Sequence, residues 1–186
     1  MPTGSVDAQL LGSWQNFYMI VGTAAATLTG LMFVAITLLA GIESHITTLN
    51  AALATYHTPT ILHFCAVLLM ASLLSVPWPS ITYPLVVLGL LSAGMVVYLA
   101  FVMRRMGHIP IPNYHPPLGD WLWYAVMPLG AHIVILIALV IFPVNWTLYC
   151  IAAAMLALLF IGLRNAWDLV SFLAVERQHA EGRSEK

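Results

Sequence analysis

Residues 121–142, WLWYAVMPLGAHIVILIALVIF, and residues 145–170, NWTLYCIAAAMLALLFIGLRNAWDLV, are two apolar stretches separated by Pro143 and Val144. Each stretch is long enough to cross a bilayer as a helix, which takes about 20 mostly apolar residues. The proline between them cannot continue a helix. The two stretches therefore predict a tight antiparallel hairpin of transmembrane helices, and this pattern decides the fold class.

Three further segments have the same apolar character, so the sequence predicts an all-α polytopic membrane protein, a bundle of five transmembrane helices. The expected spans are 14–42, 57–76, 81–103, 121–142 and 145–170. Pro77-Trp78-Pro79 predicts a second tight hairpin, between the second and third spans. A proline-rich connection over 104–120 is the one substantial loop, and its His108 and His115 match no metal-binding spacing.

The composition supports the membrane class and excludes others. Of the 186 residues, 61% are hydrophobic and 7% are charged, and the mean hydropathy is +0.93, whereas a soluble domain has roughly a quarter charged residues. The net charge of -1 leaves no basic surface for nucleic acid. Cys65 and Cys150 have no CxxC spacing, so the sequence predicts neither a disulfide framework nor a metal site.

The Lys and Arg residues predict the orientation, because cytoplasmic connections carry an excess of these residues. With the N-terminus outside, the C-terminus and the cationic residues of the connections and tail are cytoplasmic: Arg104, Arg105, Arg177, Arg183 and Lys186. Tryptophans favour both membrane interfaces. Three are expected at the outer ends (Trp14, Trp78, Trp146) and three at the inner ends (Trp121, Trp123, Trp167). We expect a short external segment over 1–13, one domain over 14–176 and a cytoplasmic polar tail over 177–186.

The first span has small residues at four-residue spacing, a pattern that lets another helix approach closely. The predicted packing seam consists of Gly22, Ala26 and Gly30 with the adjacent Thr23 and Thr27. Contact within the chain is the first interpretation of this seam, and contact with another subunit is the alternative. Gly89 and Ala93 predict a second, weaker seam on the third span.

His63 and His132 are the polar residues that stand out within the spans, because ionisable groups in a bilayer are costly and mark functional sites. One interpretation is a neutral imidazole that forms hydrogen bonds across helices. A second is a proton or ion path that also uses Thr27, Ser72 or Tyr98. A third is a haem with two histidine ligands. His63 is expected about 9 Å from its inner helix end and His132 about 18 Å from its own, which argues against haem in one subunit.

Arg164 and Asp168 are four residues apart, so they share one helix face. We expect an ion pair near the inner interface, with a buried pair beside Asn165 as the alternative. No nucleophile elbow, phosphate-binding loop or HExxH motif is present, so we expect no enzymatic activity.

Three functions fit these observations. The first is a non-enzymatic protein that acts through helix packing in the lipid bilayer, as a small homo-oligomer or an accessory subunit of another membrane protein. The second is an oligomeric ion or proton channel lined by Thr and His. The third is a haem-binding electron-transfer subunit; otherwise no cofactor and no metal are expected.

Both ends of the apolar region resemble a known group. The run Gly30-Leu31-Met32-Phe33-Val34-Ala35, after an aromatic and Ala-rich start at residues 16–29, resembles the first helix of an uncharacterised family of small bacterial membrane proteins. Residues 165–170, NAWDLV, resemble the last helix of that family. The resemblance implies a five-helix protein of the bacterial inner membrane. Some members are labelled modulators of a membrane-bound protease, and no catalytic or ligand residues carry over.

Overall fold

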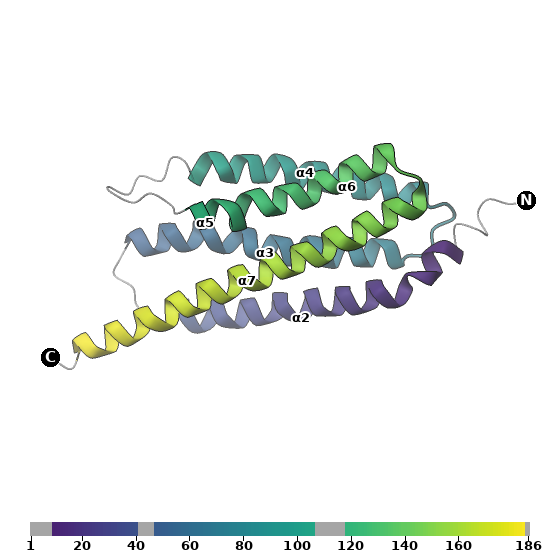
Figure 1. Cartoon of the computed structure of the whole chain (residues 1–186). Coiled ribbons are helices and arrows are strands. Elements are labelled where there is room, and N and C mark those ends of the chain that lie inside the picture. The colour runs from purple at the N-terminus through teal and green to yellow at the C-terminus, as the bar shows by residue number, and fades with distance from the viewer. Residues whose placement is uncertain (1–8, 41–46, 107–117, 185–186) are drawn as a thin grey trace, which may run out of the picture.

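The computed structural model describes residues 9–40, 47–106 and 118–184, and these residues form long helices that run side by side (Figure 1). A short helical segment over 9–13 precedes them. The elements are α2 (Gln15–Ala40), α3 (Thr47–Ser75), α4 (Thr82–Met106), α5 (Leu118–Trp121), one turn of π-helix η1 (Leu122–Val126), α6 (Met127–Ile141) and α7 (Val144–Ser184). The described part of the chain contains no strand, as the all-helical prediction requires.

Four of the helices form a ring, and the fifth packs on its outside. Each of α3 and α6 contacts both α4 and α7, so α3 and α6 occupy diagonal positions in the ring. α2 lies against α3 and α7. Both predicted hairpins are present: α3 and α4 are joined around Trp78, and α6 and α7 are joined at Pro143.

Four helical stretches are long and apolar enough to cross a membrane: Gln15–Thr37, Thr82–Met106, Leu118–Ile141 and Val144–Ser171. In α3 the apolar stretch is shorter, Pro59–Ser75. The lengths and composition of these helices thus suggest a membrane protein.

The six tryptophans divide between the two ends of the bundle as the sequence predicts. Trp14, Trp78 and Trp146 lie where α2 begins, where α3 meets α4 and where α7 begins, and we call this the Trp78 end. The other end carries the start of α5 and the finish of α4, with Arg104 and Arg105, and we call it the arginine end.

Two helices extend beyond the predicted spans. α3 begins at Thr47, ten residues before the predicted span, because polar residues that end a hydrophobic stretch do not end a helix. α7 continues to Ser184, so the helix runs on through most of the polar tail predicted over 177–186. In addition, α4 ends at Met106 and α5 starts at Leu118, so the expected loop over 104–120 is partly helical.

The seam between α2 and α3 follows a different set of residues from the predicted stripe. Gly22 is buried, and a Cβ atom added to it would lie 3.1 Å from the Cβ of Ala71 on α3. The buried α2 residues continue at spacings of three and four, as in a coiled coil: Tyr18, Val21, Ala25 and Met32. Steps of four residues advance by about 40° each, so Ala26 and Gly30 rotate away from this seam.

The outward face of α2 therefore holds the rest of the stripe: Thr23, Ala26, Thr27 and Gly30 are all exposed, and a Cβ on Gly30 would meet no atom within 4 Å. On α4, a Cβ on Gly89 would lie 3.3 Å from Leu139 of α6, whereas Ala93 is exposed. In each predicted seam, only the first glycine, Gly22 or Gly89, packs against another helix. The other residues of both seams are exposed.

Candidate functional site

His63 on α3 and His132 on α6 are buried near each other among the four helices of the ring. Both side chains are 0% exposed, and the two imidazoles interact electrostatically. Their helices are diagonal in the ring, so the pair occupies its interior rather than a seam between neighbours. Functional sites in helix bundles are commonly built in this way, from side chains on facing helices.

The two histidines are at comparable distances from the starts of their own helices. His63 is about 24 Å along α3 from Thr47, and His132 is about 21 Å from Leu118. The prediction measured the depth of His63 from His57, whereas α3 begins ten residues earlier, at Thr47. The expected difference in depth between the two histidines stays a prediction.

Neither imidazole has a hydrogen-bond partner at either ring nitrogen. The expected hydrogen bonds of these rings across helices are therefore absent. A buried donor or acceptor without a partner costs about 1–3 kcal/mol, and such groups in native proteins mark catalytic or ion-handling roles or bound water. The pair contributes four of the buried polar atoms without a partner among the described side chains, which makes it a candidate functional site.

One turn of π-helix lies toward the arginine end of the same interior. The N–H of Met127 donates to the carbonyl of Leu122 instead of that of Trp123. Pro128 explains the turn, because it has no N–H for the carbonyl of Tyr124 and its ring disfavours a regular α-helix there. The widened turn leaves the carbonyl of Trp123 free to accept another hydrogen bond.

Asn165 of α7 supplies that hydrogen bond. Its Nδ2 donates to the carbonyl of Trp123 over 3.1 Å, and the hydroxyl of Tyr124 donates to the carbonyl of Asn165 over 3.3 Å. Asn165 is 0% exposed, yet its Oδ1 has no partner. A buried acceptor thus lies between the histidine pair and the arginine end.

Arg164 and Asp168 form the predicted ion pair, with Nη1 and Oδ2 2.8 Å apart. The two side chains are 34% and 43% exposed, so the pair does not lie in the interior with the histidines. The guanidinium of Arg164 also lies over the ring of Trp123, 4.5 Å from its centroid. The ion pair thus borders the π-turn at the arginine end.

Gly162 brings α7 close to α3 beside the histidines. A Cβ on Gly162 would lie 2.5 Å from Cε1 of Phe64, the neighbour of His63 in sequence, and Phe64 is fully buried. No side chain other than hydrogen fits at this position without a shift of the phenyl ring.

The polar residues proposed to accompany the histidines lie elsewhere. Thr27 and Ser72 are exposed and Tyr98 is half-buried; the Thr27 hydroxyl donates to the carbonyl of Thr23 in its own helix. Other polar side chains are buried instead, and the sequence did not single them out for this role: Tyr18, Thr60, Ser92 and Tyr124. Pro128 was the available signal for Tyr124, since a proline inside an apolar run distorts the preceding turn.

Two of these buried groups extend the set of unpartnered polar atoms. Oγ of Ser92, on α4, and Oη of Tyr18, near the Trp78 end of α2, have no hydrogen-bond partner. Thr60 lies one helical turn before His63 and is 0% exposed.

His108 and His115 lie outside the described residues. Within the part of the chain that the structure describes, no group of three or more metal-binding side chains comes together.

Comparisons with protein-family models, with curated proteins and with solved structures find no match to this chain.

Proposed function

We propose that the chain is a non-enzymatic membrane protein that takes up and passes protons through the His63–His132 pair inside each protomer. The observation that supports this proposal is the burial of two imidazoles that interact electrostatically and none of whose ring nitrogens has a hydrogen-bond partner. Histidine chains are among the groups that relay protons inside membrane proteins.

The chemistry needs the two rings and a water molecule that carries the proton between them. A neutral imidazole has one N–H and one free nitrogen. No direct N–H···N hydrogen bond joins the two rings, so the proton needs a water molecule between them. A proton that binds the free nitrogen of one ring allows the N–H proton of that ring to pass to the water, which gives one of its own protons to the free nitrogen of the other ring. Charge moves, and only N–H and O–H bonds form and break.

Polar groups favour access from the arginine end. On that side of the pair lie Thr60, the free Oδ1 of Asn165 and the hydroxyl of Tyr124. On the other side, α3 continues toward the Trp78 end with buried apolar side chains: Val67, Met70 and Leu74. We propose that this apolar segment is the barrier to leakage and that passage to the Trp78 end requires its rearrangement.

The test is proton flux into liposomes of purified protein, driven by a potassium diffusion potential and followed with an internal pH-sensitive dye. We expect flux above that of empty liposomes, and its loss in His63→Leu and in His132→Leu. Thr27→Val is the control, because it removes an exposed hydroxyl that bonds only to its own helix. Equal flux in the wild type and both leucine variants would refute the proposal.

A second candidate is the helix-packing role, as a homo-oligomer or an accessory subunit. The outward face of α2 favours it, because the small side chains of Thr23, Ala26, Thr27 and Gly30 are exposed there and such faces let helices approach closely in a membrane. Gly30→Leu is expected to lower self-association or recovery of a partner. Gly130→Leu is the control, since its added Cβ also meets open space, on α6.

A third candidate uses the same two histidines as haem ligands, and the electrostatic interaction between them, which places them near each other, favours it. Absorbance spectroscopy separates it from the first: a Soret band in purified protein that is lost in His132→Leu supports haem, and a colourless protein after haem supplementation excludes it.

The proposal also covers the number of membrane spans, their orientation and the membrane in which the protein resides. We propose that α3 is a fifth span, that the arginine end is cytoplasmic and that the protein resides in the bacterial inner membrane, in the family that the residues 30–35 and 165–170 resemble. Cysteine labelling from each side of the membrane tests the orientation.

A further inference from the structure

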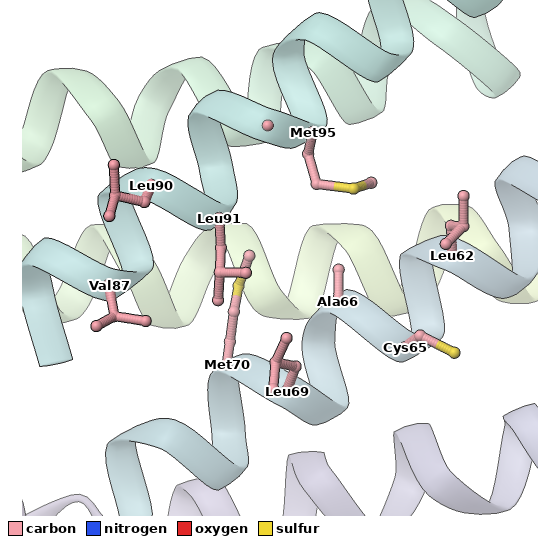
Figure 2. A pocket seen from close by; sticks show the side chains of 10 residues that line it. Leu62, Cys65, Ala66, Leu69, Met70, Val87, Leu90, Leu91 and Met95 are labelled. Carbon is pink, nitrogen blue, oxygen red and sulfur yellow. The ribbon is translucent and has the colours of Figure 1, made fainter.

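A groove lies between α3 and α4, apart from the histidine pair. Its volume is about 460 Å³, within the range of small-molecule sites. It is a groove open on one side rather than an enclosed cavity, and almost all its lining is apolar. Figure 2 shows Leu91 of α4 and Met70 of α3 pointing toward each other between the two helices.

The groove is lined by the part of α4 that is long and apolar enough to span a membrane. In a membrane, the open side of the groove would face the hydrocarbon chains of the lipids. Apolar side chains that line an empty space lose dispersion contacts. A lipid chain in the groove would restore these contacts, so the filled groove is more stable than the empty one. Gly94 widens the groove, because a Cβ there would meet no atom within 4 Å.

A cation lies on the same face of α4, beyond the groove toward the arginine end. Arg105 is eleven residues after Gly94, which is close to three whole turns and about 16 Å. That length matches half of the roughly 30 Å hydrocarbon core. Arg105 is exposed, so its guanidinium is available to a lipid headgroup.

Tyr98 connects the groove to this cation. It lies one turn from Gly94 on the same face, is half-buried and interacts electrostatically with Arg105. The face thus presents a cation, then an amphipathic ring, then an apolar groove, which is the order of polarity along a phospholipid from headgroup to chain end.

We propose that this face binds an anionic phospholipid, with the phosphate at Arg105, the glycerol region at Tyr98 and one acyl chain that enters the groove beside Gly94 and Met95 and continues toward Val87. Basic sites between or beside transmembrane helices recognise anionic headgroups in this way. The site is independent of the histidine pair, so its failure leaves the proton proposal untouched.

Native mass spectrometry of the full chain in detergent tests the site, with phosphatidylglycerol and phosphatidylcholine of identical chains added in turn. We expect phosphatidylglycerol to be retained more strongly, and Arg105→Gln to weaken its retention by about fivefold. Gly94→Leu fills the groove and is expected to weaken retention as well. Because the added Cβ meets open space, we expect this variant to fold.

Two controls match these variants. Arg104→Gln removes the same charge about 100° around the helix, and Gly130→Leu adds the same side chain on α6, outside the groove lining. Both are expected to retain phosphatidylglycerol like the wild type. Equal retention of the two lipids by the wild type, no loss in Arg105→Gln or Gly94→Leu, or an equal loss in Arg104→Gln would overturn the proposal.

Discussion

The side-chain amide of Asn165 donates to the backbone carbonyl of Trp123 over 3.1 Å, and that carbonyl is free only because Met127 donates one residue further back, to Leu122. A proline at 128 thus creates the acceptor that α7 uses to fix its position against η1. The local distortion of one helix and the polar residue of another form a single structural unit.

Removal of the amide is therefore expected to destabilise the bundle. Asn165→Ala leaves the Trp123 carbonyl without its partner, which should lower the free energy of unfolding by about 1–3 kcal/mol. Asn145→Ala, in an exposed position of the same helix, is the control and should change it by less than about 0.5 kcal/mol. The measurement is unfolding in mixed micelles, and equal effects of the two variants would contradict the assignment.

Gly162 is expected to tolerate no side chain. Gly162→Ala places a Cβ 2.5 Å from Phe64, and overpacking of this kind lowers stability by about 1–3 kcal/mol. The double variant with Phe64→Leu should recover part of the loss, because the ring that clashes is gone. Gly130→Ala, which meets open space, should instead raise helix stability by about 0.5–1 kcal/mol. A measured loss that Phe64→Leu does not relieve would show that the contact is not its cause.

The histidine pair predicts a conflict between stability and function. His63→Leu or His132→Leu removes buried nitrogens that have no partner, so each variant should raise the free energy of unfolding by about 1–3 kcal/mol while proton flux falls. Thermal unfolding monitored by circular dichroism gives the first quantity. A lower free energy of unfolding in both variants would mean that the imidazoles form hydrogen bonds in the membrane-embedded protein, which would contradict this prediction.

The ion pair of Arg164 is expected to contribute little. Both partners are about one-third or more exposed, and exposed pairs contribute at most about 1 kcal/mol. Asp168→Asn should therefore shift the free energy of unfolding by less than this amount, because Arg164 keeps its contact with Trp123. A loss of several kcal/mol would show that the pair is shielded from water in the membrane.

Substitutions at Gly22 and Gly30 are expected to distinguish the two faces of α2: the face that packs against α3 within the monomer and the exposed face that we propose for association with another chain. Gly22→Leu should lower monomer stability, because even a Cβ there lies 3.1 Å from that of Ala71. Gly30→Leu should leave monomer stability unchanged, since its side chain meets open space. Unfolding measured at high dilution in detergent isolates the monomer, and equal losses in the two variants would contradict the packing of α2 described above.

Much of the architecture follows from the sequence. Long apolar runs and the breaks at Pro77, Pro79 and Pro143 locate helices and hairpins, because hydropathy and proline act on the chain locally. The start of α3 at Thr47 was missed for the same reason: hydropathy reports the membrane, whereas a helix continues through polar residues wherever its hydrogen bonds allow.

The candidate site is a different case, because it depends on which helices are neighbours. His63 and His132 stand out individually from the sequence, but nothing in either segment tells that α3 and α6 are diagonal partners in one ring. The face of α2 that packs is equally hidden, since helices that are apolar all around show no periodic pattern. The role of Asn165 required knowledge of the π-turn on another helix.

α7 has no break from Val144 to Ser184, a run of 41 residues and a length of about 61 Å, twice the hydrocarbon core of a bilayer. In Figure 1 it extends beyond its neighbours at the arginine end. A helix without a break moves as one rigid element. The turn that carries Asn165 and the projecting end therefore belong to the same element, so a tilt of that end would also tilt the turn that holds the carbonyl of Trp123.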